Sequence, residues 1–169
     1  GHRIDGNSGI LAYNFYPNTG DMVIDTDDNF FDNKSNNSIG FRNVLAHEHG
    51  HGIGQPHTCP INQTKLMEPF LTTAFDGPQH DDILAGNRGY GDPYEKPRSN
   101  DAVNKATDAG SLGNGATTVA GASIDDASDV DFFKFTVGAP KKIAITVSPV
   151  GSTYKSGPQN GNSCSSGTD

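Results

Sequence analysis

Three histidines and one glutamate occupy the positions that a catalytic zinc ion would require. The segment from His47 to His57 reads H-E-H-G-H-G-I-G-Q-P-H, which matches the pattern H-E-x-x-H-x-x-G-x-x-H. Residues four apart on a helix share one face, so the imidazoles of His47 and His51 can bind the same metal ion. Three protein ligands leave the fourth position of a tetrahedral zinc open for water, which is typical of a catalytic zinc.

The glycine in this pattern allows a third ligand, His57, to reach the metal. Gly54 allows a sharp turn after the helix, because glycine accepts positive φ without steric cost, and this turn returns His57 to the metal. Glu48 is offset by one residue from His47, so it lies beside the zinc, where it can take a proton from a zinc-activated water. The pattern predicts hydrolysis of a peptide bond, with Glu48 as general base. Two alternatives are a His-rich loop that binds metal adventitiously and a zinc hydrolase that acts on non-peptide amides.

Local patterns predict the elements that position these residues. Four elements are expected before residue 90: strands within 9–16 and over 22–24, a helix over about 39–52, and a short helix over about 78–85. Ser38 is the expected cap of the first helix. Glycines at 86, 89 and 91 are expected to end the second helix.

Composition excludes several classes of protein. The chain has 169 residues with a net charge of -8, which disfavours nucleic acid or an anionic membrane as a partner. Apolar runs are only a few residues long, so no membrane span is expected. Hydrophobic residues make up 33%, and the chain has 21 Gly and 10 Pro, so the core is expected to be modest. Cys59 and Cys164 could pair with each other, pair elsewhere or be free.

The amino-acid composition of the chain changes after residue 91. Residues 92–99 form a charged, proline-bearing linker, and Gly, Ser, Thr, Ala and Asp dominate beyond it. Apolar residues alternate in 133–137 and again in 143–147, which predicts two strands joined by a hairpin at 138–141. Residues 100–169 are therefore interpreted as the start of an all-β module.

A second metal is suggested by carboxylates near the start of the chain. Asp25 and Asp28 lie in an acidic cluster, and Asp5 lies upstream beside a glycine. Carboxylates on glycine-rich loops suit a hard cation such as calcium. The alternative is a solvated acidic turn.

Taken together, residues 1–91 resemble the matrixins, a family of metzincin zinc endopeptidases. Besides the zinc pattern, Leu66-Met67-Glu68-Pro69 resembles the family's Met-turn, which places Met67 beneath the metal. Pro69, Phe70 and Leu71 resemble the wall of the S1′ specificity pocket. Asp81-Asp82 resembles the start of the family's last helix, whose acidic residues brace the Met-turn.

The resemblance implies an α+β fold: a partial mixed sheet, an active-site helix and a C-terminal helix, in a catalytic domain lacking its N-terminal part. It also implies that the strand within 9–17 pairs with an extended substrate, and it favours calcium binding by Asp5, Asp25 and Asp28. Residues 123–126 and 129–137 resemble a bacterial pre-peptidase C-terminal domain, a β-sandwich that would be incomplete in this chain.

The expected protein is a secreted, extracellular zinc metalloendopeptidase and a monomer, with protein or peptide substrates. Its expected cofactors are a catalytic Zn²⁺ and a structural Ca²⁺. The alternative is a catalytically inactive zinc-binding or adhesion module.

Overall fold

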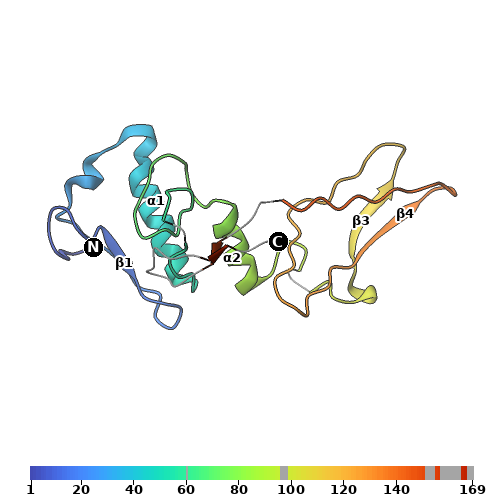
Figure 1. The fold of residues 1–169 in the computed structure, drawn as a ribbon, viewed down its shortest axis with the longest axis horizontal. Helices are drawn as coiled ribbons and strands as arrows, with labels where there is room; N and C mark the ends of the chain where they lie inside the picture. Colours follow the sequence, from blue (N-terminus) through green and yellow to red (C-terminus); the bar gives the residue numbers. More distant parts are fainter. Residues whose placement is uncertain (60, 96–98, 151–154, 157–164, 167–169) are drawn as a thin grey trace. The chain divides into compact units, whose positions relative to one another are not determined.

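The computed structural model describes residues 1–59, 61–95, 99–150, 155–156 and 165–166. The chain forms two compact units, one built on residues 1–86 and the other on residues 87–150 (Figure 1). The first unit contains the histidine pattern and is therefore the one that determines the site.

A small antiparallel sheet opens the first unit. Strand β1 (Ala12–Asn14) pairs with β2 (Met22–Ile24), and Tyr13 lies opposite Val23. Both strands form where β-formers flank the turn signal at 17–20, as predicted. The 3-10 helix η1 (Asn29–Asp32) follows, and the side chain of Asp28 accepts a hydrogen bond from the amide of Phe30 at its start.

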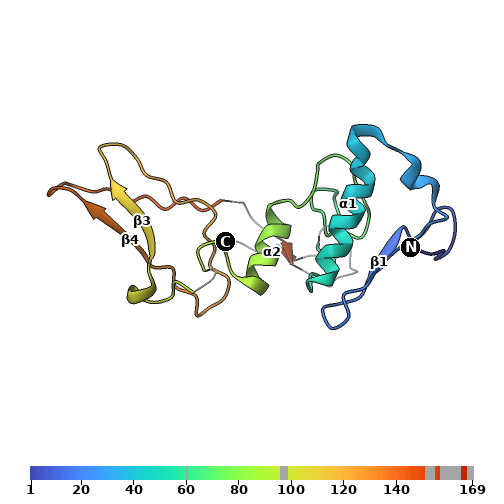
Figure 2. The same cartoon turned by 180° about the vertical axis from the view of Figure 1, so that it is seen from behind.

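Helix α1 (Ser35–Gly52) carries the histidines and lies beside β1, as both views show (Figures 1 and 2). Residues 36–38 have left-handed backbone angles, so the regular helix begins after Ser38. That start agrees with the predicted helix over 39–52. The predicted cap at Ser38 is wrong, because Ser38 has left-handed backbone angles (φ 57°, ψ 42°), whereas a capping serine has extended angles.

Helix α2 (His80–Tyr90) is longer than the sequence indicated. We predicted an end at Gly86, but the helix continues through Gly86 and Gly89. A Cβ at residue 86 would lie only 3.2 Å from Nε2 of Gln55. Gly86 therefore provides space for a neighbouring side chain inside the helix and does not terminate it.

The core of the first unit is small, as its composition predicted. In the described part of the chain, the buried apolar side chains are Val44, Leu66 and Met67. Buried polar groups outnumber them and include Asp25, Asn43, Glu68 and Asp82. Such groups are tolerated only when they are hydrogen-bonded, so the loops of this unit are organised by polar contacts as much as by apolar burial.

In the second unit, strand β3 (Thr107–Leu112) pairs in parallel with β4 (Phe133–Val137), and the short 3-10 helix η2 (Val103–Lys105) precedes them. Strand β4 was predicted. The predicted strand over 143–147 and its hairpin are wrong, because this segment is irregular and exposes Ile145 and Val147 to 78% and 85%. The pairing in this unit does not confirm a β-sandwich.

Two further strands, β5 (Lys155–Ser156) and β6 (Ser165–Ser166), form an antiparallel pair.

Cys59 is disulfide-bonded, which removes the possibility that it is a free thiol. Cys164 lies outside the described residues. Within the described residues, no helix combines the length and apolar character needed to cross a membrane.

Candidate metal centre and active site

The three predicted ligands converge on one point. Nε2 of His57 lies 3.3 Å from Nε2 of His47 and 3.2 Å from Nε2 of His51. A tetrahedral zinc with Zn–N bonds of about 2.0–2.1 Å holds its nitrogens about 3.3 Å apart. The spacing of these nitrogens therefore fits a zinc ion bound by all three imidazoles.

Main-chain carbonyls orient two of these imidazoles. The Nδ1 of His47 lies 2.7 Å from the carbonyl oxygen of Leu66, and the Nδ1 of His51 lies 2.8 Å from that of Gln55. A carbonyl oxygen only accepts hydrogen bonds, so each Nδ1 carries the proton and each Nε2 presents its lone pair. Burial, together with the neighbouring imidazoles, lowers the pKa of His47 to about 4, which keeps its ring neutral for metal binding.

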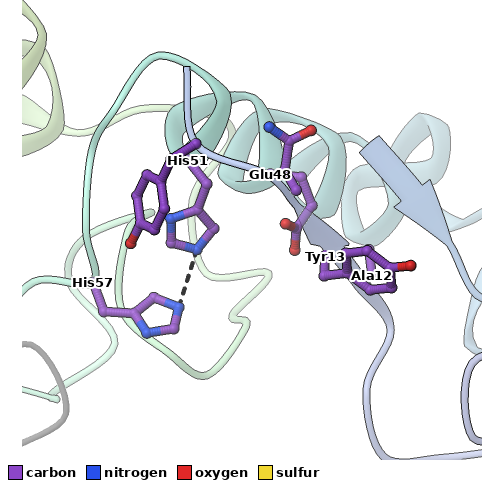
Figure 3. Close-up of a pocket in the computed structure, with 7 residues that line it drawn as sticks. Ala12, Tyr13, Glu48, His51 and His57 are labelled. Atoms are coloured by element: carbon purple, nitrogen blue, oxygen red, sulfur yellow. Dashed lines mark hydrogen bonds between the residues drawn. The ribbon is translucent and has the colours of Figure 1, made fainter. Parts of the chain in front are cut away.

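Glu48 lies in the same cleft. Its carboxyl group points from α1 toward Ala12 and Tyr13 of β1 (Figure 3). The side chain is buried, and its Oε2 has no hydrogen-bond partner within the described part of the chain. Burial raises the pKa of Glu48 to about 7. A carboxyl group with this pKa can accept and return a proton near neutral pH.

An open cleft of about 300 Å³ lies at the histidines, lined by Ala12, Tyr13, Asn14, Tyr16, Glu48, His51 and His57. The ring of Tyr16 packs edge-on against His51, with ring centroids 5.8 Å apart. Strand β1 thus forms one wall of the cleft and α1 another. Pro69, Phe70 and Leu71 do not line this cleft, so their role as the S1′ wall stays a prediction.

Comparison with known proteins agrees with this geometry. The family model described as Matrixin matches residues 1–91, which include the triad, Glu48 and all of α2.

The chain belongs to the matrixin family.

Curated relatives of this matrixin chain include Karilysin from Tannerella forsythia, 35% identical over 63% of the chain, and Stromelysin-3 from Mus musculus, 36% identical over 56%. Matrix metalloproteinase-2 from Drosophila melanogaster is 41% identical over 35% of the chain. The matches cover only 23%, 20% and 9% of these relatives, respectively. No solved structure matches the chain.

The turn at residues 66–69, predicted to be the Met-turn, is held by α2. Met67 is 1% exposed and lies against α1, where its Sδ occupies the space that a Cβ at Gly50 would need. The carboxylate of Asp82 accepts the amides of Leu66 and Met67 at 2.8 and 3.0 Å. The expectation that an acid of the last helix braces the turn is therefore confirmed for Asp82.

Glu68 fixes the loop over residues 62–65, which precedes Met67. Its Oε2 accepts the amides of Asn62 and Gln63, each at 2.6 Å, and its Oε1 accepts those of Thr64 and Lys65 at 2.8 and 3.1 Å. The ammonium group of Lys65 lies 3.1 Å from Oε1, and both side chains are buried. Burial opposes the charge, but these hydrogen bonds outweigh it and lower the pKa of Glu68.

The structure does not bring the three predicted calcium carboxylates together into a ligand cluster among the described residues. The Oδ2 of Asp25 accepts the amides of Ile4, Asp5 and Gly6, and its Oδ1 accepts that of Asp27. Asp28 accepts the amides of Ser8 and Phe30. These carboxylates therefore organise the N-terminal loop, and calcium binding stays a prediction without support from their geometry.

The sequence also gave no indication of three converging carboxylates in the second unit, Glu95, Asp125 and Asp129. Burial raises the pKa of Asp125, and repulsion from Asp129 and other nearby carboxylates adds to this effect. The sequence also did not indicate that Leu66 and Gln55 orient the imidazoles of His47 and His51. Both act through a main-chain carbonyl, which every residue type carries.

Proposed function

We propose that the chain carries the zinc-dependent peptidase centre of a secreted metalloendopeptidase, with His47, His51 and His57 as ligands and Glu48 as general base. The observation that carries the proposal is the convergence of three Nε2 atoms at zinc-binding spacing beside a buried, unpaired carboxylate. Membership of the matrixin family supports the reaction class.

Each group has a role that follows from its position. Zinc, when bound, supplies a Lewis acid that polarises the scissile carbonyl and acidifies a water molecule. Glu48 takes the proton of the attacking water and delivers it to the leaving amine, for which a pKa near 7 suits the carboxyl group. Leu66 and Gln55 hold the imidazoles of His47 and His51 in the tautomer that faces the metal.

The substrate of this centre is an extended peptide that lies along β1. Strand β1 pairs with β2 on one edge, and its three residues line the cleft. An extended chain can therefore add to β1 through main-chain hydrogen bonds while its scissile bond lies over the histidines. The relatives include matrix metalloproteinases by name, which agrees with a protein or peptide substrate.

The test compares the unsubstituted chain with Glu48→Ala, measuring zinc content by mass spectrometry and cleavage of casein and a quenched peptide library. We expect one zinc per chain in both proteins and loss of cleavage only in Glu48→Ala. Normal cleavage by Glu48→Ala would exclude Glu48 as the base. Zinc binding by both proteins without cleavage by either would favour the alternative of an inactive zinc-binding module.

A further inference from the structure

Gln55 is held at both ends, and each end leads to a different part of the metal centre. Its main-chain carbonyl accepts the Nδ1 proton of His51 at 2.8 Å. Its side-chain Nε2 donates to the main-chain carbonyl of Asp82 at 3.0 Å. The residue is only 9% exposed, so both hydrogen bonds lie inside the protein.

The backbone around Gln55 provides the first part of this arrangement. Gly54 has a φ of +96°, a conformation that favours glycine, and turns the chain out of α1. The amide of Gln55 then donates to the carbonyl of Gly50 at 2.9 Å, inside the last turn of the helix. This turn directs the carbonyl of Gln55 back toward His51, four residues earlier.

Two glycines make room for the side chain. A Cβ at residue 50 would lie 3.4 Å from Oε1 of Gln55, and a Cβ at residue 86 would lie 3.2 Å from its Nε2. Gly50 belongs to α1 and Gly86 to α2, so the amide lies between the two helices. Packing therefore fixes the side chain in the one direction in which it reaches Asp82.

Asp82 connects this contact to a second ligand. Its carboxylate accepts the amide of Leu66 at 2.8 Å, and the carbonyl of Leu66 accepts the Nδ1 proton of His47 at 2.7 Å. Asp82 therefore acts on His47 through its side chain and on His51 through its main chain and Gln55. The imidazoles of His47 and His51 are therefore both connected to Asp82 of α2 through hydrogen bonds.

From these contacts we propose that Gln55 is a positioning residue of the zinc centre, whose side-chain hydrogen bond to α2 sets the orientation of His51 and thereby the affinity for zinc. This inference rests on the zinc site of the proposed function. Residues that orient metal ligands typically change metal affinity by about 10–100-fold when they are mutated.

The main test uses Gln55→Met, which keeps the length of the side chain and removes its hydrogen bond. The matched control is Gln79→Met, because the Nε2 of Gln79 also donates to a main-chain carbonyl, that of Gly77, at 3.0 Å, but that bond leads to no histidine. In the full chain, the zinc dissociation constant is measured by chelator competition, and the visible spectrum of the Co²⁺-loaded protein reports ligand geometry. The thermal midpoint of the zinc-free protein is measured in parallel.

We expect Gln55→Met to weaken zinc binding about 10–100-fold and to change the Co²⁺ spectrum, and we expect Gln79→Met to do neither. A second variant, Gly86→Ala, keeps glutamine at position 55 but displaces its side-chain amide, because the new Cβ would lie 3.2 Å from Nε2. Alanine favours the helix by about 1 kcal/mol over glycine, so weaker zinc binding with no loss of zinc-free stability would separate positioning from folding. This variant decides the matter alone if Gln55→Met does not fold.

The inference is overturned if Gln55→Met and Gly86→Ala bind zinc as the unsubstituted chain does. It is also overturned if zinc affinity falls only in step with zinc-free stability in every variant, control included. If the unsubstituted chain itself binds no zinc, the proposed function fails as well, so the two failures are distinguishable.

Discussion

Glu68 offers the sharpest test of how polar contacts organise this fold. One carboxylate accepts four consecutive main-chain amides, from Asn62 to Lys65, and also neutralises the buried ammonium group of Lys65. Glu68→Gln keeps the size of the side chain but removes its charge. The new NH₂ group also faces two main-chain amides that the carboxylate oxygen had accepted.

The expected cost can be worked out from these contacts. Removing one partner of a buried ion pair destabilises a protein by about 3–5 kcal/mol, because the other charge stays buried and uncompensated. Each unsatisfied amide costs about 1–3 kcal/mol, but these costs are not additive with the first. We therefore expect Glu68→Gln to lower the free energy of unfolding by about 4 kcal/mol. In the double variant with Lys65→Met, which removes the second charge, we expect recovery of about 2 kcal/mol.

The assay is urea unfolding followed by circular dichroism, combined with hydrogen exchange of the amides of residues 62–65. Asp76→Asn is the control, because Asp76 pairs with Arg42 at the surface of the same unit and such pairs contribute about 0–1 kcal/mol. The reasoning is refuted if Glu68→Gln unfolds within about 1 kcal/mol of the unsubstituted chain and its loop amides exchange at unchanged rates.

The pH dependence of this contribution has a definite sign. The pKa of Glu68 is lowered in the folded protein from its ordinary value of 4.5. A depressed carboxylate pKa stabilises the fold fully above the unfolded value, and the contribution is lost as pH falls through the folded value. The difference in stability between the unsubstituted chain and Glu68→Gln should therefore be constant above pH 4.5 and shrink below it.

Two further predictions concern the contact between Gly50 and Met67 and the buried carboxylate of Asp25. Gly50→Ala would place a Cβ against the Sδ of Met67. We expect this overpacking to lower the free energy of unfolding by about 1–3 kcal/mol, measured by urea unfolding. A double variant that also shortens residue 67 should recover part of the loss. At Asp25, burial opposes the charge, but four main-chain amides outweigh it and lower the pKa to about 2, so its contribution should persist down to about pH 3.8 and disappear as pH falls through 2. A carboxyl carbon titration by NMR checks this value, and a midpoint near 3.8 would contradict it.

The chemistry of the site was predictable because it is local. His47, Glu48 and His51 lie within one helical turn and a half, so their sequence spacing alone fixes their relative directions. Gly54 and His57 extend the same argument by six residues. The regular start of α1 after Ser38 was likewise available from apolar spacing.

Apart from the acids that the family resemblance placed under the turn at 66–69, the supporting contacts were not predictable, because they join residues far apart in the chain to main-chain atoms. The carboxylate of Asp82 accepts the amide of Leu66, and the side chain of Gln55 donates to the carbonyl of Asp82. Every residue type carries a main-chain carbonyl, and all but proline carry an amide, so the sequence does not mark these partners. The strand predicted over 143–147 failed for a related reason. Alternation shows which residues could share a sheet face, but it does not choose the partner strand, and β4 pairs with β3 instead.

Three glycines of the first unit have a consequence for how this domain can vary in sequence. Gly50, Gly52 and Gly86 each border a side chain that a Cβ would crowd: the side chains of Met67 and Asn14 overlap the Cβ position at Gly50 and Gly52, and that of Gln55 lies 3.2 Å from it at Gly86. Any larger residue at one of these glycines has to be matched by a smaller or shifted neighbour. In a library that randomises each glycine together with its partner, functional sequences should therefore show paired changes of opposite volume. The Gly52 pair should vary independently, whereas changes at Gly50 and Gly86 should be correlated, because the Gln55 side chain borders both glycines.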